Sequence, residues 1–312
     1  MGLLTTVGCE QSVATNSRNG LINTLLSASG IGGVATAVLV VLSVAVAGTV
    51  RFGIGDIGPA VWKVVVISWV AFAGMVGGTW AGGRANETNP FGLVWGYGLA
   101  SGAMIMSAAM FLVPQAIGLG AGADNPRAGG IGLALGVVIG YSAHTVGHRL
   151  THIEFPIDIT AAQITVHALA AGAIIGLVYN SMPSLGLLLG LAIVSHKGPA
   201  GYAAARRLQR DGYDTEILLL PAAGVGLTAI PSALLPVPAQ PVVNAVVFGF
   251  AAGIFLHVAM DFLPTCETGS EIDQVVSVEA NAHALLDRLR THAVGSTLVG
   301  GLAVVATWIV VT

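Results

Sequence analysis

Two histidines stand inside long apolar runs, in closely related settings. Ala-Leu-Ala-Ala-Gly follows His167 and Lys-Gly-Pro-Ala-Gly follows His196, so a glycine comes five residues after each histidine. An ionisable side chain in a membrane helix is costly unless it faces protein, water or a ligand. Imidazole is a good ligand for zinc, iron and similar divalent ions. The pair therefore predicts a metal site, and the alternative is two histidines hydrogen-bonded across a helix interface.

The residues after the second histidine add a helix break and a charge. Pro199 has no backbone N–H, so the carbonyl of Ser195 loses its helical partner beside His196. Broken helices are common at the ion sites of transporters. The ammonium of Lys197 needs a counter-charge, and Asp261 is the candidate partner because it is the only acid well inside a late apolar run. Lys197 would then take the place of a second metal ion, or an ion pair would simply hold the bundle together.

Five further residues are candidates to assist a metal ion. His257 lies one turn before Asp261 on the same helical face, and both are candidate auxiliary ligands. His144, His148 and His152 recur at every fourth residue, so one face of a helix end carries three imidazoles. We expect either an exit relay that passes the metal toward the cytoplasm or an interfacial polar stripe.

The elements that must position these residues are membrane helices. Of 312 residues, 54% are hydrophobic and only 9% are charged, and the mean hydropathy is +0.83. A soluble domain has about 25% charged residues, so soluble enzymes are excluded. The apolar runs last about twenty residues, which fits helices rather than the strands of a membrane barrel. A net charge of −3 offers no footprint for nucleic acid.

We predict an all-α, polytopic membrane bundle of nine spans. They cover approximately residues 31–50, 62–81, 91–118, 131–148, 159–179, 185–208, 216–235, 242–264 and 293–311. A charged stretch at 267–290 is expected to contain an interfacial helix. A short turn makes the fifth and sixth spans antiparallel neighbours, so His167 and His196 can meet near the middle of the membrane.

The placement of Lys and Arg predicts a cytoplasmic N-terminus in the cell membrane. The inner loops would hold Arg18, Arg84, Arg149, Arg206, Arg207, Arg210, Arg288 and Arg290, and the outer loops Arg51, Lys63 and Arg127. Cys9 and Cys266 are too few for a disulfide framework or a four-thiolate metal site.

These motifs together resemble the ZIP (zinc- and iron-regulated-transporter-like) family of metal transporters. The stretches that begin at His167 and at His196 stand where the fourth and fifth family helices carry their histidine motifs, and His196-Lys197-x-Pro199 is similar to the branch with His-Lys-x-Pro. The segment from Ala252 to Ala259, followed by Leu263-Pro264, resembles the seventh family helix, and Gly102 to Pro114-Gln115 resembles the second. The resemblance implies eight core helices over residues 61–312. Residues 1–60 would then be a tail and one additional span.

The resemblance implies a carrier for divalent transition metals that works by alternating access. Zinc is the first expectation, with Fe²⁺, Mn²⁺ or Cd²⁺ as other cargo and no permanently bound cofactor. His167 and His196 would be the core ligands, with Asp261 and His257 as auxiliaries. The additional span is expected at the periphery or at a dimer interface, which leaves a homodimer open. The expected partners are the metal ion and the lipid bilayer.

The chain departs from the family pattern at its carboxylates. Ala171 and Ala200 stand where the family has acids, and Gln115 replaces the acid after Pro114. The alternative function is therefore a degenerate member of the fold that no longer transports metal and has a structural or regulatory role. An intramembrane hydrolase is a third hypothesis, but no His-Glu-x-x-His pattern exists and no acid stands next to either histidine. We therefore expect no enzyme activity.

Overall fold

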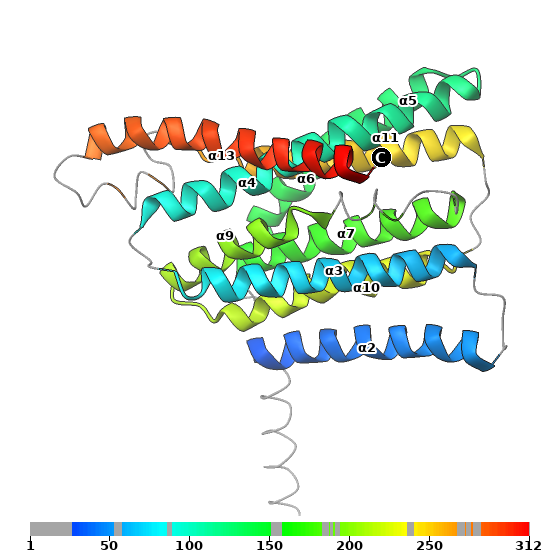
Figure 1. The fold of residues 1–312 in the computed structure, drawn as a ribbon, viewed down its shortest axis with the longest axis horizontal. Coiled ribbons are helices and arrows are strands. Elements are labelled where there is room, and N and C mark those ends of the chain that lie inside the picture. Colours follow the sequence, from blue (N-terminus) through cyan, green and yellow to red (C-terminus); the bar gives the residue numbers. More distant parts are fainter. Residues whose placement is uncertain are drawn as a thin grey trace, which may run out of the picture.

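The computed structural model describes residues 27–52, 58–85, 89–150, 158–182, 187, 190, 194–235, 240–266, 272, 276 and 282–311. Within these residues all regular structure is helical (Figure 1). The helices are α2 (Ala28–Phe52), α3 (Pro59–Gly82), α4 (Pro90–Ser107), η1 (Ala108–Leu112), α5 (Val113–Gly122), α6 (Arg127–Leu150), α7 (Ile159–Ser181), α9 (Lys197–Arg210), η2 (Thr215–Leu218), α10 (Leu219–Ser232), α11 (Pro241–Asp261) and α13 (Ala282–Val311).

Seven helices of the described chain are long and apolar enough to cross a membrane, so the polytopic, all-helical prediction is confirmed. These spans are Ser29–Thr49, Ala60–Gly82, Pro90–Gly122, Ala161–Ser181, Thr215–Ser232, Pro241–Asp261 and His283–Ile309. The predicted fourth span is α6, whose apolar part, Arg127–Ser142, is shorter. Much of the first half of the predicted sixth span lies outside the described residues.

Two predicted elements differ from the structure for identifiable reasons. The third span is not uniformly α-helical, because η1 is a π-helical turn just before Pro114. Proline cannot donate to the carbonyl four residues earlier, and a wider turn accommodates that loss. The last helix begins at Ala282 rather than Ala293, so residues 282–290 of the charged stretch belong to α13. The interfacial helix expected in this stretch falls mostly on residues outside the described ranges.

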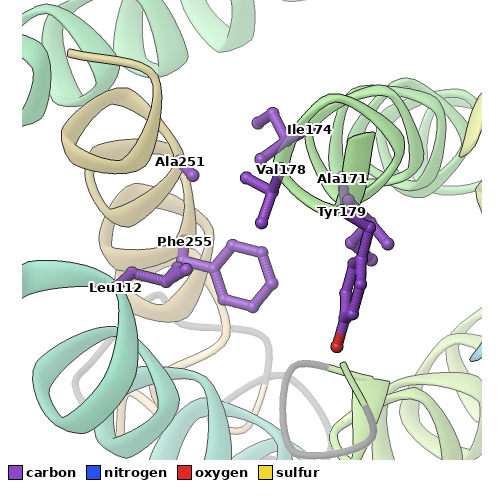
Figure 2. Close-up of a pocket in the computed structure, with 8 residues that line it drawn as sticks. Leu112, Ala171, Ile174, Val178, Tyr179, Ala251 and Phe255 are labelled. Carbon is purple, nitrogen blue, oxygen red and sulfur yellow. The ribbon is translucent and has the colours of Figure 1, made fainter. Parts of the chain in front are cut away.

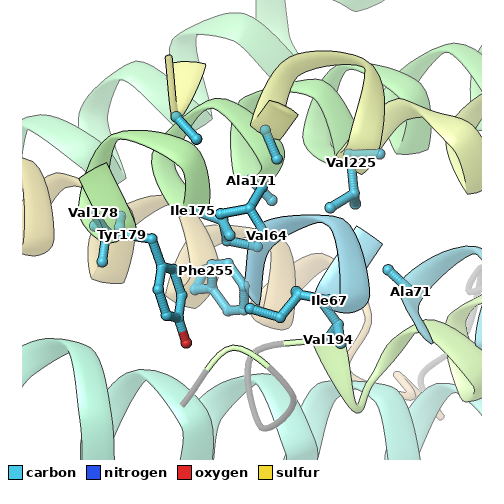
Figure 3. Packing of buried hydrophobic residues seen from close by; sticks show 14 of the residues in the cluster. Val64, Ile67, Ala71, Ala171, Ile175, Val178, Tyr179, Val194, Val225 and Phe255 are labelled. Carbon is cyan, nitrogen blue, oxygen red and sulfur yellow. The ribbon is translucent and has the colours of Figure 1, made fainter. Parts of the chain in front are cut away.

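The helices form two blocks, and Figure 1 shows α2 at the outer edge of the first block. The first block contains α2, α3, α7, α9 and α10, and the second contains α4, η1, α5, α6, α11 and α13. Contact between the blocks runs mainly through α4 against α9 and α11 against α7. The main hydrophobic core crosses this boundary, because Phe255 of α11 packs with Ile175 and Val225 of the first block (Figure 3).

Within each block, glycines let helix backbones touch. On α6, Gly132 meets the backbone of Val246 in α11, and two turns later Gly140 meets His257. Gly78 of α3 meets the carbonyl of Gly198 in α9 in the same way. Small residues at four-residue spacing are typical of helices packed closely in lipid, where interhelical attraction comes from close contact. These glycine seams fix the rotation of each helix and thus the direction of its polar side chains.

Candidate functional site

The two histidines of the apolar runs meet inside the bundle. His167 comes from the middle of α7, and His196 is the residue that precedes α9. Their ring centroids are 5.7 Å apart, with the ring planes inclined at 57°. Both side chains are buried, with exposed fractions of 9% and 2%. The prediction that His167 and His196 lie together is therefore confirmed.

Local structure places the second histidine. Ser195 and His196 form a turn, and α9 starts at Lys197 with Pro199 in its first turn, which agrees with the predicted helix break. Upstream, the backbone N–H of Gly190 donates to the Tyr179 hydroxyl at 2.9 Å. This bond ties the stretch before α9 to the end of α7 and so holds His196 near its partner helix.

The surroundings of His167 do not satisfy its ring by hydrogen bonds. Within the described part of the chain, neither its Nδ1 nor its Nε2 has a hydrogen-bond partner, and both atoms are buried. A buried polar atom normally has a partner, because leaving it without one costs free energy. The alternative of two histidines bonded across an interface therefore does not hold for His167 in this structure, and the ring is available to a ligand.

An aromatic ring from the opposite block closes the histidine pair. Phe255 of α11 lies 5.7 Å from the ring centroid of His167 and 5.4 Å from that of His196. Its exposed fraction is 2%. Sequence reasoning did not assign Phe255 to the site, although it stands in the family-like segment of α11. The missed signal is a large aromatic side chain in a run of alanine and glycine.

Lys197 lies deep in the bundle beside the pair. Its side chain is 2% exposed. Its Cβ lies against Gly74 of α3, where an added Cβ would be 3.8 Å away. Among the described residues no ion pair of Lys197 is found. The expected pairing with Asp261 is therefore wrong in this structure, because the Asp261 carboxylate lies beside His257 instead.

The predicted auxiliary ligands form a separate pair. His257 Nε2 lies 3.4 Å from Asp261 Oδ2, one helical turn away. The His257 ring faces α6, where it contacts Gly140 and the ring of Tyr141. Phe255 is two residues before His257 and thus about 200° around the helix. The His257–Asp261 pair therefore lies on the face of α11 opposite to the one that packs against His167 and His196.

The four predicted metal ligands are therefore not one centre. No group of three His, Cys, Asp or Glu side chains placed to hold a metal ion occurs among the described residues. The exit-relay histidines are only partly visible: His144 and His148 belong to α6, but their side chains, and all of His152, lie outside the described parts.

An apolar cavity lies beside the pair, at the boundary between the blocks (Figure 2). It is lined by Ala171 and Ile174 of α7, Phe255 of α11 and Leu112 of η1, among others. Its volume is about 10 Å³, close to the least that one water needs, and its lining has no exposed polar surface. Ala171, one turn after His167, thus stands where a longer polar side chain would point into the cavity.

The chain segment that carries both histidines and Lys197 contains no acid. The chain has no Asp or Glu between residues 159 and 210, which covers α7, α9 and everything between them. Only Glu216, Asp261 and Asp287 fall inside the apolar spans, and all three are exposed near a span end. Within the described part of the chain, the site therefore offers two imidazoles next to a buried lysine, and no carboxylate joins them.

Comparison with known proteins adds no relative. No family model matches the chain, and no curated protein sequence matches it.

Proposed function

We propose that this chain is a membrane carrier for a divalent transition-metal ion, zinc first, and not an enzyme. The observation that carries the proposal is the His167–His196 pair, buried between α7 and α9 with ring centroids 5.7 Å apart. Two imidazoles that face each other without a structural hydrogen bond at His167 suit a borderline metal such as zinc. The motif order resembles that of the ZIP family, which motivates the choice of cargo.

The roles of the other residues follow from their positions. Lys197 places a positive charge where a second metal ion would otherwise bind, so we propose one metal ion per site. His257 and Asp261 face α6 rather than the pair. We propose that they form a transient binding site on the path of the metal, and that His144, His148 and His152 form further such sites toward the cytoplasm.

Alternating access would come from movement of one block against the other. Both histidines and Lys197 belong to the first block, while Phe255, which covers the two rings, belongs to the second. The glycine seams join helices within a block, and the cavity beside Ala171 lies between blocks. Sliding at this boundary would uncover the metal site to one side of the membrane at a time.

One observation favours a second candidate function. Zinc normally takes three or four protein ligands, and the pair supplies two. A chain that has lost the ligands expected at Ala171 and Ala200 could retain the fold as a structural or regulatory membrane subunit without transport.

Metal uptake into vesicles that contain the purified full-length chain separates the two functions. We expect zinc uptake above that of empty vesicles, and we expect His167→Ala and His196→Ala each to reduce it by roughly tenfold or more, because each removes one of two protein ligands. His283→Ala, on the exposed start of α13, is the matched control and should leave uptake unchanged.

Two outcomes would refute metal transport. One is uptake no greater than in empty vesicles, with the protein shown to be folded by its thermal unfolding transition. The other is uptake that both histidine variants leave unchanged. Elemental analysis of the purified protein gives an independent check of metal binding.

A further inference from the structure

We propose that the groove between the start of α9 and the α4–α13 pair holds a hydrocarbon chain of a membrane phospholipid. This binding site goes beyond the proposed function and does not depend on it. Its support is the chemistry of the groove lining, the opening of the groove toward the lipid-facing surface, and its position between the two blocks.

The groove is apolar and much larger than one water molecule. Its volume is about 120 Å³, whereas a single water needs about 10–15 Å³. Of the eight residues described in its lining, five have apolar side chains, one is glycine and none is charged. The two polar residues are Ser195 and Thr307, and the Thr307 hydroxyl donates to the carbonyl of Ala303 at 2.8 Å. An ordered water needs two to four polar partners, so this lining favours hydrocarbon over water.

The groove opens toward the surface of the bundle that meets the bilayer. Ala303 and Thr307 of α13 line it and are exposed, and the neighbouring Leu302 has an exposed fraction of 60%. All three residues belong to the apolar span His283–Ile309, and Ala303 lies six residues, about 9 Å, before the end of that span. The medium around a spanning helix at this depth is lipid hydrocarbon. An acyl chain is therefore the occupant that the surroundings supply.

Helix packing places the groove where a close helix pair meets a helix break. Gly300 of α13 lies against the backbone of Leu99 in α4, and an added Cβ there would overlap the Leu99 carbonyl. These two helices form one side of the groove. The other side is formed by Ser195, in the turn before α9, and by Pro199, in the first turn of that helix.

A hydrocarbon chain in the groove contacts both blocks. Pro199 belongs to the first block, whereas Leu99 and Ala303 belong to the second. A chain that fills the space adds dispersion contacts between the blocks that the protein alone lacks. Because the chain binds the folded bundle, it stabilises the bundle against unfolding. The stabilisation comes from the apolar chain rather than from the head group, since none of the described lining residues is charged.

The first test measures thermal unfolding of the full-length protein in detergent, after its lipid is removed and dioleoylphosphatidylcholine is added back. We expect the added phospholipid to raise the unfolding temperature by about 2–4 °C. Ala303→Leu fills the groove with a side chain and should reduce that rise by roughly half or more. Ala306→Leu adds the same atoms to an exposed position of α13 that does not line the groove, and it should keep the full rise.

Two measurements on the native protein locate the ligand independently of variant folding. Glycerophosphocholine, which is the same head group without acyl chains, should not raise the unfolding temperature. A phosphatidylcholine with a photoreactive group in its acyl chain should cross-link to the peptides that contain Leu99 and Ala303.

Four outcomes would overturn the lipid site. They are no rise with phospholipid in the native protein, an equal rise in Ala303→Leu, a rise produced by the head group alone, and cross-links confined to other surfaces. None of these measurements involves zinc, so the lipid site and the proposed metal transport succeed or fail separately.

Discussion

At the scale of single residues, the chemistry is set by what the site lacks. Two imidazoles meet at the boundary of α7, α9 and α11, and the position one turn after His167 is Ala171. Replacing a methyl group by a carboxylate there changes both the ligand number and the net charge. Ala171 is therefore the most informative single position for the metal hypothesis.

Ala171→Asp should tighten zinc binding, with a dissociation constant roughly tenfold lower in an isothermal titration. The added carboxylate lies one turn from His167 and would supply both a third ligand and a negative charge.

Ala171→Asn is the matched control, because it adds nearly the same volume without charge and should not tighten binding to the same extent. Equal affinities of the Asp and Asn variants would show that the site does not respond to charge and would contradict a metal centre at His167. The double variant Ala171→Asp, Ala200→Glu should bind zinc more tightly than either single variant if both carboxylates face the same ion.

The sequence correctly predicted contacts between residues that a short connection in the chain brings together. A short turn between two apolar runs makes neighbouring helices, so the meeting of His167 and His196 could be foreseen. The separation of His257 and Asp261 from that pair could not. Which face of α11 points inward depends on the glycine seam with α6, and a helix rich in alanine and glycine has no polar stripe that reveals its rotation.

At the scale of elements, adjacent glycines on α3 have different roles. A Cβ on Gly78 would overlap the backbone carbonyl of Gly198 in α9, whereas nothing lies within 4 Å of a Cβ on Gly77. One glycine is required by the packing of two helices, and its neighbour faces open space. The pair therefore offers a test of the seam in which both substitutions add the same methyl group.

Gly78→Ala should destabilise the protein by about 1–3 kcal/mol, because a well-packed interface must open to admit the methyl group. Gly77→Ala should be neutral or stabilising by about 0.5–1 kcal/mol, since alanine favours a helix over glycine. Thermal unfolding in detergent measures both. A lower transition temperature for Gly77→Ala than for Gly78→Ala would contradict the packing of α3 on α9.

The existence of the elements was predictable, but their details were not. Apolar runs of about twenty residues identify the helices in lipid. The early start of α13 could not be read from hydropathy, because its first turns carry Asp287, Arg288 and Arg290 and continue the helix outside the apolar stretch. The π-turn of η1 depends on Pro114, whose position predicts a disturbance but not its form.

At the scale of the whole molecule, the close helix pairs run in parallel. Gly132 and Gly140 of α6 meet Val246 and His257 of α11 in the same order along both chains. The same order holds for α3 with α9. Two parallel helices cross the membrane in the same direction. Their span numbers, counted along the chain, must therefore differ by an even number. The predicted spans two and six, and four and eight, satisfy this condition.

The distribution of arginine predicts the orientation of this topology in the membrane. With a cytoplasmic N-terminus, Asp214 between α9 and η2 should lie inside and Asn125 between α5 and α6 outside; both are exposed. Asn125→Cys should react with an impermeant maleimide on intact cells, and Asp214→Cys only after the cells are opened.

The two native cysteines are first replaced, Cys9→Ser and Cys266→Ala. Burial raises the pKa of the Cys266 thiol, so its own labelling would be slow and would blur the difference if it were retained. The reverse labelling pattern would place the N-terminus outside, and equal labelling of both sites on intact cells would contradict the topology.

The glycine seams have a mechanical consequence. Helices that touch backbone to backbone have few side chains between them that could change rotamer, so each pair is stiff and shifts as one piece. The two blocks can shift more easily where α11 meets α7, because only the Phe255 ring and a small cavity lie between them there. Although the chain has 43 glycines, its described helices are expected to move chiefly at the boundary between the two blocks. His167 and His196 lie at that boundary.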